Sequence, residues 1–240
     1  MSKLYFRYGA MNSGKTTLLL QVAHNYEERG MNVVILKPGI DTKGDDKIVT
    51  RIGLKRRVDH LIDKDEKLSD YLNTLTSDIV CILVDESQFL SRDQVDELFM
   101  YAKLKNKPVI CYGLRSDFKS MAFPGSQRLF EVADVMEELI TICRCGKRAK
   151  FNGRIVNGEF TSSGEQVAID GENEVEYESL CGGCYFGEEM AIREVLCAEG
   201  SPYSWGGSRY GNGTYKNKTT TDIWDINCCL IGLNSHHQIF

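Results

Sequence analysis

The sequence lacks the features that define fibrous, disordered and membrane-spanning chains. Only 4 of its 240 residues are proline, 42% are hydrophobic and 26% are charged, which excludes a collagen, a mucin-like stalk and a wholly disordered chain. No apolar run approaches the roughly 18–20 residues that a membrane helix needs. Residues 1–8 carry only a short mixed apolar run, so we expect no signal peptide and a cytoplasmic protein.

An excess of positive charge is also missing. The 29 Lys and Arg residues are outnumbered by 34 Asp and Glu residues, and the formal net charge is −5. Proteins that bind duplex DNA in bulk make many cationic contacts to phosphates. The charge balance therefore argues against nucleic acid as the main partner. The length suits one or two domains whose cores need no disulfides.

Cysteine, in contrast, is abundant, with nine residues. Without a signal peptide we do not expect a disulfide framework. Cys143 and Cys145 form one close pair, and Cys181 and Cys184 form a second. Four thiolates in two pairs predict a tetrahedral Zn²⁺ site, although the first pair has C-x-C spacing instead of the usual C-x-x-C. The alternative is four unrelated reduced cysteines.

The first part of the chain alternates strand and helix patterns. A helical spacing covers residues 15–29, and Ser91 with Gln94 forms a capping box that opens a helix reaching about Lys105. Residues 41–57 are polar and predict a long loop or a hairpin. Continuous apolar runs, typical of strands buried on both faces, cover residues 33–36, 79–84 and 109–112. The pattern predicts an α/β fold with a mostly parallel sheet covered by helices.

Composition divides the chain into three parts. Residues 1–142 form the predicted α/β domain, and residues 143–190 form a small module held by the metal site. Residues 191–240 are rich in Gly, Ser, Thr and Asn without a clear period, and predict a disordered or poorly packed tail.

Residues 9–16, GAMNSGKT, match the phosphate-binding pattern G-x-x-x-x-G-K-[ST]. Glycines allow backbone N–H groups to surround phosphate, and the helix that follows adds the positive end of its dipole. In this pattern the lysine reaches the β- and γ-phosphates and the hydroxyl binds Mg²⁺. The alternative is a chance glycine turn, but the strand before it and the helix after it favour a nucleotide site. The predicted residues are Gly9, Ala10, Met11, Asn12, Ser13, Gly14, Lys15 and Thr16.

A carboxylate pair, Asp85 and Glu86, follows the apolar run of residues 79–84. An acid at the end of a strand beside a phosphate loop is the Walker B arrangement, in which Asp85 holds Mg²⁺ through water. Glu86 can accept a proton from a hydroxyl or from water. The alternative is a solvated residue at a strand end, and Asp117 is a weaker rival base. The nucleotide-binding residues of this segment are predicted to be Asp85, Glu86, Ser87 and Gln88.

Several segments together resemble the type II thymidine kinases, which are cytosolic, zinc-containing enzymes. In order, they are GAMNSGKT at residues 9–16, DESQFL at 85–90, CYGLRSDF at 111–118, FPGSQ at 123–127 and the cysteine module at 143–184. The resemblance covers about residues 3–189. It implies a RecA-like P-loop domain, a zinc-bearing lasso domain and a homotetramer.

The resemblance also implies an activity, the transfer of the γ-phosphate of ATP to the 5′-hydroxyl of thymidine in nucleoside salvage. Glu86 is then the general base, Lys15 and Thr16 serve the phosphates and Mg²⁺, and Asp85 supports the metal ion. ATP, Mg²⁺ and structural Zn²⁺ are the implied cofactors, with Cys143, Cys145, Cys181 and Cys184 as zinc ligands. Thymidine and ATP are the implied partners, with no nucleic acid and no membrane.

The thymine pocket of the family maps onto Met11, Phe89, Leu114, Phe118, Phe123 and Tyr177. A loop that closes over the nucleoside is expected around Val167, Ala168, Ile169, Asp170 and Gly171. From the sequence alone, the favoured interpretation of Phe89, Phe118 and Phe123 is that they are core residues, and only the mapping from the family places them in the pocket. Arg154 is either a phosphate contact or a solvated arginine. The tail from about residue 191 matches nothing in these kinases.

Two other functions remain open from the residues. The first is a P-loop ATPase in which Glu86 positions water, although the aromatic segment at residues 118–123 instead suggests a pocket for a small acceptor. The second is a zinc-ribbon module for nucleic acid. Its support is the basic cluster at residues 147–154, and the acidic net charge opposes it.

Overall fold

The computed structural model describes residues 1–39, 46–166 and 175–198, with side chains described as far as residue 191. The chain divides into two compact units, residues 1–199 and 200–240. The second unit lies outside the described residues, and so does most of the predicted tail. Within the described residues, no helix is both long enough and apolar enough to cross a membrane.

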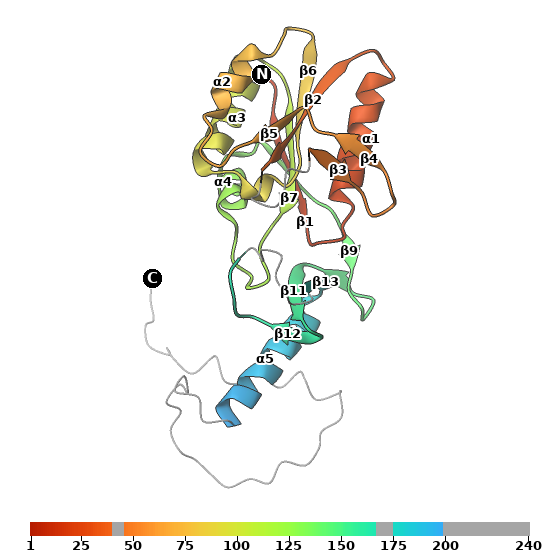
Figure 1. Ribbon diagram of the computed structural model, residues 1–240, viewed down its shortest axis with the longest axis vertical. Coiled ribbons are helices and arrows are strands. Elements are labelled where there is room, and N and C mark those ends of the chain that lie inside the picture. Colours follow the sequence, from red (N-terminus) through yellow and green to blue (C-terminus); the bar gives the residue numbers. More distant parts are fainter. Residues whose placement is uncertain (40–45, 167–174, 199–240) are drawn as a thin grey trace, which may run out of the picture. The chain divides into compact units, whose positions relative to one another are not determined.

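A six-stranded sheet forms the centre of the larger part of the first unit (Figure 1). All neighbouring strands are parallel, which confirms the predicted α/β fold. In spatial order the strands are β5 (His60–Ile62), β2 (Asn32–Pro38), β6 (Ile79–Val84), β7 (Val109–Leu114), β1 (Leu4–Gly9) and β8 (Val135–Glu138).

Helices cover both faces of this sheet, and alternate residues of each strand face them. From β2, Val34 and Leu36 pack into one cluster, while Val33 and Ile35 pack into the other. Figure 1 shows α1 on one side and the other three helices opposite. These helices are α1 (Lys15–Glu27), α2 (Leu68–Thr74), α3 (Arg92–Leu104) and α4 (Pro124–Val132). Burial on both faces explains why the strands are continuous apolar runs.

The helix boundaries follow local signals in the sequence. The predicted capping box at Ser91 and Gln94 is present at the start of α3. The expected helix at residues 15–29 ends slightly earlier, at Glu27, and the chain then turns through Gly30 with φ +70°. A left-handed residue at this point is the usual end of a helix that stops at glycine.

The segment expected to be a loop or a hairpin contains a short hairpin of β3 (Lys47–Val49) and β4 (Lys55–Arg57). Ile48 and Val58 are 2% and 6% exposed and pack with α1 residues in the same cluster. Residues 41–45 of that segment lie outside the described residues.

A smaller module follows the sheet. It contains the hairpin of β9 (Thr141–Ile142) and β10 (Arg148–Ala149) and an antiparallel sheet in the order β12 (Glu159–Thr161), β11 (Phe151–Val156), β13 (Val175–Leu180). Helix α5 (Gly182–Ala198) follows β13 and continues beyond residue 190, where the sequence suggested that the module ends. Tyr185 is buried, and its hydroxyl donates a hydrogen bond to the Phe118 carbonyl at 2.5 Å.

Candidate active site

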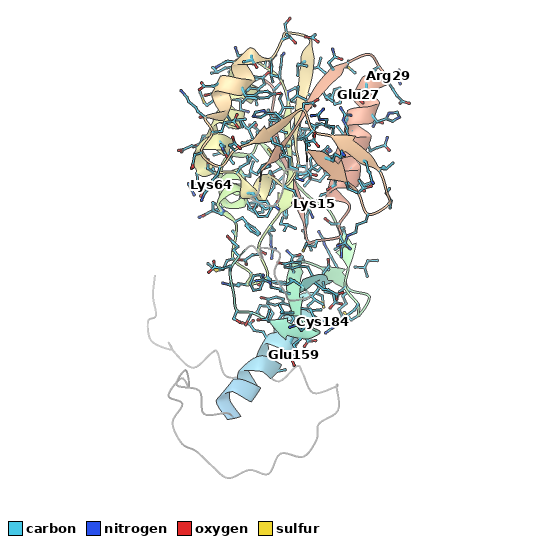
Figure 2. All side chains as sticks on the ribbon, in the orientation of Figure 1. Lys15, Glu27, Arg29, Lys64, Glu159 and Cys184 are labelled. Atoms are coloured by element: carbon cyan, nitrogen blue, oxygen red, sulfur yellow. The ribbon has the colours of Figure 1, made fainter. Side chains whose placement is uncertain are left out.

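The phosphate loop connects β1 to α1, as predicted. Gly14, directly before α1, has φ +75°, a conformation that favours glycine. Lys15 opens the helix (Figure 2) and is 9% exposed. Its Nζ donates hydrogen bonds to the Ala10 carbonyl at 2.8 Å and to Ser13 Oγ at 3.3 Å. Burial lowers the pKa of Lys15, and the nearby charges of Glu86 and Asp85 oppose that effect. The ammonium group thus lies over the loop that is expected to hold phosphate.

Asp85 lies directly after β6 and is 3% exposed. Burial, together with the charge of Glu86, raises the pKa of Asp85 to about 7, although a hydrogen bond with the Thr16 side chain opposes the rise. The Thr16 hydroxyl and the Asp85 carboxyl are therefore neighbours. Mg²⁺ prefers such oxygen ligands and usually keeps several waters, so this pair fits the metal ion of a nucleotide site.

Glu86 has an unusual backbone conformation, with φ +49°. Its carboxylate accepts a hydrogen bond from Gln88 Nε2 at 2.6 Å, and the backbone N–H of Leu114 donates to Gln88 Oε1 at 3.0 Å. Gln88 is fully buried. The hydrogen bonds of Gln88 therefore connect Glu86 to the end of β7 and hold its carboxylate in one orientation.

The 3₁₀ turn Ser87–Phe89 lies directly against β7. Ser87 Oγ donates to the Tyr112 carbonyl at 2.9 Å. At Gly113, an added Cβ would lie 2.7 Å from Ser87 Oγ and 2.9 Å from Gln88 Oε1, so only glycine allows this approach. Ser87 and Gln88, expected among the nucleotide-binding residues, are fully buried and line neither cavity described below.

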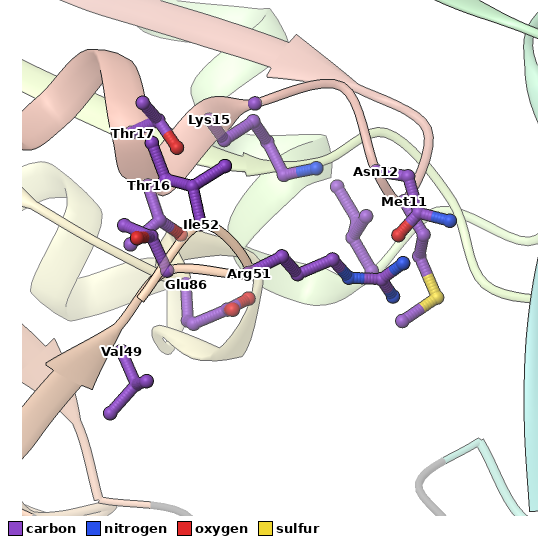
Figure 3. A pocket seen from close by; sticks show the side chains of 12 residues that line it. Met11, Asn12, Lys15, Thr16, Thr17, Val49, Arg51, Ile52 and Glu86 are labelled. Carbon is purple, nitrogen blue, oxygen red and sulfur yellow. The ribbon is translucent and has the colours of Figure 1, made fainter. Parts of the chain in front are cut away.

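A cavity of about 370 Å³ lies over the phosphate loop (Figure 3). Seven predicted residues line it: Met11, Asn12, Gly14, Lys15, Thr16, Glu86 and Leu114. The lining residues that the sequence did not indicate are Thr17 and four from the hairpin, Val49, Thr50, Arg51 and Ile52. The hairpin residues carry no motif, and only the fold brings them to the loop.

A second cavity, of about 200 Å³, adjoins the first. All six described residues of the predicted thymine pocket line it: Met11, Phe89, Leu114, Phe118, Phe123 and Tyr177. The rings of Phe89 and Phe123 meet edge to face at 5.3 Å. Asp117, Asn152 and Gln166 add polar groups to this largely apolar lining. The predicted residues Val167, Ala168, Ile169, Asp170 and Gly171 lie outside the described residues.

Asp117, the rival base, accepts hydrogen bonds at both of its carboxylate oxygens. Its Oδ1 accepts from the backbone N–H groups of Lys119 and Met121 at 2.9 and 2.8 Å, and its Oδ2 accepts from Gln166 Nε2 at 3.0 Å. The side chain is buried and lines the second cavity, whereas Glu86 lines the first. Of these two carboxylates, Glu86 is the one that lines the cavity over the phosphate loop.

Arg154 is not a solvated arginine, because it is 6% exposed. Its guanidinium lies 4.5 Å from the Phe118 ring centroid and 5.8 Å from that of Tyr177. One Nη donates to the Glu165 carbonyl at 2.8 Å. Arg154 therefore packs against two walls of the second cavity. Since Arg148 also pairs with Glu138 at 2.7 Å, the basic cluster that supported nucleic-acid binding is partly engaged within the protein.

Met11 lines both cavities, and the smaller module holds its backbone. The Met11 N–H donates to Asn152 Oδ1 at 2.8 Å, and its carbonyl accepts a hydrogen bond from Ser179 Oγ. Asn152 also donates to the Ser116 carbonyl at 2.8 Å. These contacts come from β11 and β13, far from the loop in sequence. No pattern in the sequence indicated Asn152 or Ser179.

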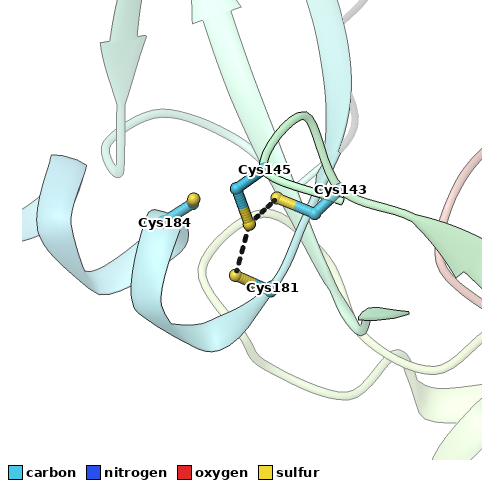
Figure 4. Close-up of side chains that lie close together, drawn as sticks. All are labelled: Cys143, Cys145, Cys181 and Cys184. Carbon is cyan, nitrogen blue, oxygen red and sulfur yellow. Dashed lines mark hydrogen bonds between the residues drawn. The ribbon is translucent and has the colours of Figure 1, made fainter. Parts of the chain in front are cut away.

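The four predicted zinc ligands meet at one point (Figure 4). Their sulfur atoms all lie within 4.8 Å of one another. Cys145 Sγ is 3.6 Å from Cys143 Sγ and 3.5 Å from Cys181 Sγ. A tetrahedral Zn²⁺ site with bonds of about 2.3 Å has sulfur–sulfur edges of about 3.8 Å, so the cluster fits this ion. The C-x-C spacing does not prevent Cys143 from joining the other three.

The thiols of the cluster differ in acidity. Burial acts to raise the pKa of Cys143, but hydrogen bonds from the backbone N–H groups of Cys145 and Cys181 outweigh it and lower the value to about 7. The Cys184 backbone N–H similarly lowers the pKa of Cys181. Burial and the neighbouring thiols raise the pKa of Cys184 to about 12. The backbone N–H groups around Cys143 and Cys181 thus favour the thiolate form, which is the form that zinc would require.

The parallel sheet, its phosphate loop and the apolar cavity next to the loop define a P-loop phosphotransferase for a small acceptor. The sequence model of the family described as thymidine kinase matches residues 2–185, and the chain belongs to this family. The four-cysteine cluster agrees with the zinc-containing type II branch that the sequence suggested.

Several curated relatives carry the name thymidine kinase. The protein from Mannheimia succiniciproducens is 42% identical over 185 residues, which are 75% of this chain and 93% of that one. The one from Rhodopirellula baltica is 44% identical over 75% of this chain and 86% of its own length. The one from Idiomarina loihiensis is 40% identical over 80% of this chain and 100% of its own length.

Proposed function

We propose that this chain transfers the γ-phosphoryl group of ATP to the 5′-hydroxyl of thymidine, with Glu86 as the general base. One observation carries the proposal. Met11 and Leu114 line both the phosphate cavity and the apolar cavity, and Glu86 lines the phosphate cavity beside them. A donor phosphate in the first cavity and an acceptor in the second would therefore meet next to a carboxylate.

The phosphate end of the site provides positioning and charge. Backbone N–H groups of the loop and the start of α1 bind the phosphates, and Lys15 exchanges its contact with the Ala10 carbonyl for a phosphate oxygen. Thr16 and Asp85 would hold Mg²⁺, which would supply charge neutralisation for the transferred group. Phosphoryl transfer depends mainly on such positioning and charge stabilisation.

The chemical step is a proton transfer coupled to displacement. Glu86 accepts the proton of the 5′-hydroxyl, and the hydroxyl oxygen bonds to the γ-phosphorus. The bond between the γ-phosphorus and the oxygen that links it to the β-phosphate breaks, and that oxygen leaves as part of ADP. The Gln88 hydrogen bond at 2.6 Å holds the carboxylate for this role. The aromatic walls of the second cavity suit the flat pyrimidine, and its polar groups orient it.

The domain division is part of the same proposal. Residues 1–142 serve as the P-loop kinase domain, and residues 143–190 serve as the zinc-binding lasso domain that completes the nucleoside site. The contacts of Asn152 and Ser179 to Met11 support the role of the second domain in completing the nucleoside site. The homotetramer and the cytoplasmic location typical of the type II branch belong to the proposal as well.

A coupled assay of ADP release tests the proposal. The full chain is assayed with ATP and Mg²⁺ and with thymidine, deoxycytidine, deoxyguanosine or no acceptor. We expect release that depends on thymidine. Release without an acceptor would instead indicate an ATPase in which Glu86 activates water.

The role of Glu86 is tested with Glu86→Gln. The new amide oxygen can still accept the Gln88 hydrogen bond, so the substitution removes basicity with little change of shape. Thymidine-dependent kcat should fall by about 10²–10⁴-fold, the scale of a lost general base. Glu131→Gln is the matched control, because Glu131 lies on α4 and pairs with Arg92 at the surface. Turnover close to wild type in Glu86→Gln would remove Glu86 from the role.

A further inference from the structure

The β3–β4 hairpin forms one wall of the phosphate cavity. Val49, Thr50, Arg51 and Ile52, at its tip, line the cavity opposite the phosphate loop. The sequence pattern identified this segment only as a loop or a hairpin. Its position raises the question of what the single cation at the tip, Arg51, does there.

The hairpin is anchored, so its tip has a defined place. Ile48 and Val58 are buried against α1. Arg56 donates two hydrogen bonds to Glu27 of α1, at 3.0 and 2.7 Å. The same helix begins at Lys15, so the anchor connects the hairpin to the element that carries the phosphate loop.

The turn at the tip is also fixed. Thr50 is 4% exposed. The Thr50 N–H donates to the Leu54 carbonyl at 2.8 Å, and the Leu54 N–H donates to Thr50 Oγ1 at 2.9 Å. Gly53 takes a φ of +89°, which closes the turn. Arg51 therefore projects from a closed turn whose base is held in the core.

Arg51 extends across the cavity. Figure 3 shows its guanidinium directed toward Met11 and Asn12, at the same end of the cavity as the Lys15 ammonium, while the Glu86 carboxylate lies nearer the base of the Arg51 side chain. The other two arginines of the hairpin, Arg56 and Arg57, pair with Glu27 and Asp46. Within the described residues, no hydrogen bond or ion pair engages the Arg51 guanidinium.

The Lys15 ammonium and the Arg51 guanidinium both line this cavity and lie at the same end of it (Figure 3), and the charge of Arg51 acts to lower the pKa of Lys15. Two like charges directed into one space favour an anion between them. Met11, toward which Arg51 points, lines the acceptor cavity as well, so this end is where the terminal phosphate would lie. The guanidinium offers a planar pair of donors that matches phosphate oxygens, which lysine cannot offer.

We propose that Arg51 binds the γ-phosphate of ATP from the hairpin and stabilises the charge that develops on it during transfer. This inference rests on the proposed function and adds a catalytic residue to it. An arginine supplied from within the chain plays this part in some other phosphoryl-transfer enzymes. No covalent step is added, because Arg51 remains protonated and contributes charge and hydrogen bonds only.

Two variants of Arg51 and one control test the contact. Arg51→Gln removes the charge, and Arg51→Lys keeps the charge but loses the planar pair of donors. Lys55→Gln removes one positive charge from an exposed position of the same hairpin outside the cavity. Each protein is compared in thymidine-dependent kcat, in the dissociation constants of ADP and of an imido analogue of ATP, and in thermal unfolding.

Arg51→Gln should lower kcat by about 10²–10³-fold and weaken the binding of the ATP analogue by about tenfold or more. The affinity for ADP should remain nearly unchanged. The kcat of Arg51→Lys and its affinity for the ATP analogue should lie between those of Arg51→Gln and wild type. Lys55→Gln should match wild type in both quantities. Thermal unfolding should stay near wild type throughout, since Arg51 is exposed.

Three results would overturn the inference. They are wild-type kcat in Arg51→Gln, an equal loss of affinity for ADP and the ATP analogue, and the same losses in Lys55→Gln. Failure of the proposed function would look different, because wild-type protein would then release no ADP in response to thymidine. The comparison of ADP with the ATP analogue would still decide whether Arg51 contacts the γ-phosphate.

Discussion

Replacing Gln88 with methionine tests whether the hydrogen bond to Glu86 matters for turnover. Methionine has a similar length and an apolar end, so it fills the buried space without offering a donor or a strong acceptor. The change removes two interactions. Glu86 Oε2 loses its donor at 2.6 Å, and the Leu114 N–H loses its acceptor at 3.0 Å.

The size of the effect follows from these two bonds. A hydrogen bond to a charged group contributes about 1.5–3 kcal/mol, and each 1.4 kcal/mol changes a rate by about tenfold. If this whole contribution acts on the orientation of Glu86 in the transition state, kcat falls by about 10–100-fold. The unpaired Leu114 amide lowers the free energy of unfolding by about 1–3 kcal/mol. The KM for thymidine should change little, because Gln88 does not line the nucleoside cavity.

Gln94→Met is the matched control. Gln94 is also a buried glutamine, 3% exposed, and its side chain donates to the carbonyls of Asp63 and Glu66 at 2.9 and 3.1 Å. It caps α3 and lines neither cavity. Denaturant unfolding should show a similar loss of stability in both variants, whereas ADP release with thymidine should show a loss of kcat only in Gln88→Met.

Two outcomes would refute this reasoning. In the first, Gln88→Met keeps wild-type kcat per folded molecule, which would mean that Glu86 needs no fixed orientation. In the second, Gln94→Met loses as much kcat as Gln88→Met. The effect would then come from general destabilisation and not from the hydrogen bond to Glu86.

Two further predictions concern metal ions. Because burial raises the pKa of Asp85 to about 7 in the ligand-free fold, above the value of about 4 in an unfolded chain, its contribution to stability is present at low pH and is lost as the pH rises through 7. Asp85→Asn should thus raise the thermal unfolding temperature more at about pH 8 than at about pH 5. Parallel plots of unfolding temperature against pH for the variant and the wild type would contradict this expectation. The same variant should abolish Mg²⁺-dependent turnover. Cys184→Ser should reduce bound zinc, measured by metal analysis, and lower the unfolding temperature by about 5–10 °C, and zinc content equal to wild type would remove Cys184 from the ligand set.

Local patterns in the sequence were sufficient to predict the parallel sheet and the position of the phosphate loop. The apolar run at residues 79–84 has the same bounds as β6, because a strand buried on both faces admits few polar residues. The capping box depends on contacts within one turn of helix, so the four residues from Ser91 to Gln94 are enough to predict it. The cysteine pairs were recognisable because the chemistry of zinc restricts the residue type and the spacing.

The remaining parts of the site depend on contacts between distant segments. Arg51 and Asn152 reach the phosphate loop only through the fold, and neither belongs to a motif. The choice between core and pocket for Phe118 and Phe123 also needed the structure. Both are almost fully buried and both line the second cavity, so the two interpretations describe the same residues.

The zinc cluster is linked to the reacting groups through the residues next to Cys181. Ser179, two positions before it, donates to the Met11 carbonyl, and Tyr185, four positions after it, donates to the Phe118 carbonyl. A metal ion that fixes Cys181 therefore fixes two contacts to the walls of the nucleoside cavity. Loss of zinc should consequently lower kcat and thymidine affinity in molecules whose parallel sheet remains folded. On the proposed function, a structural metal would contribute to turnover by positioning Met11, one of the two residues that line both cavities.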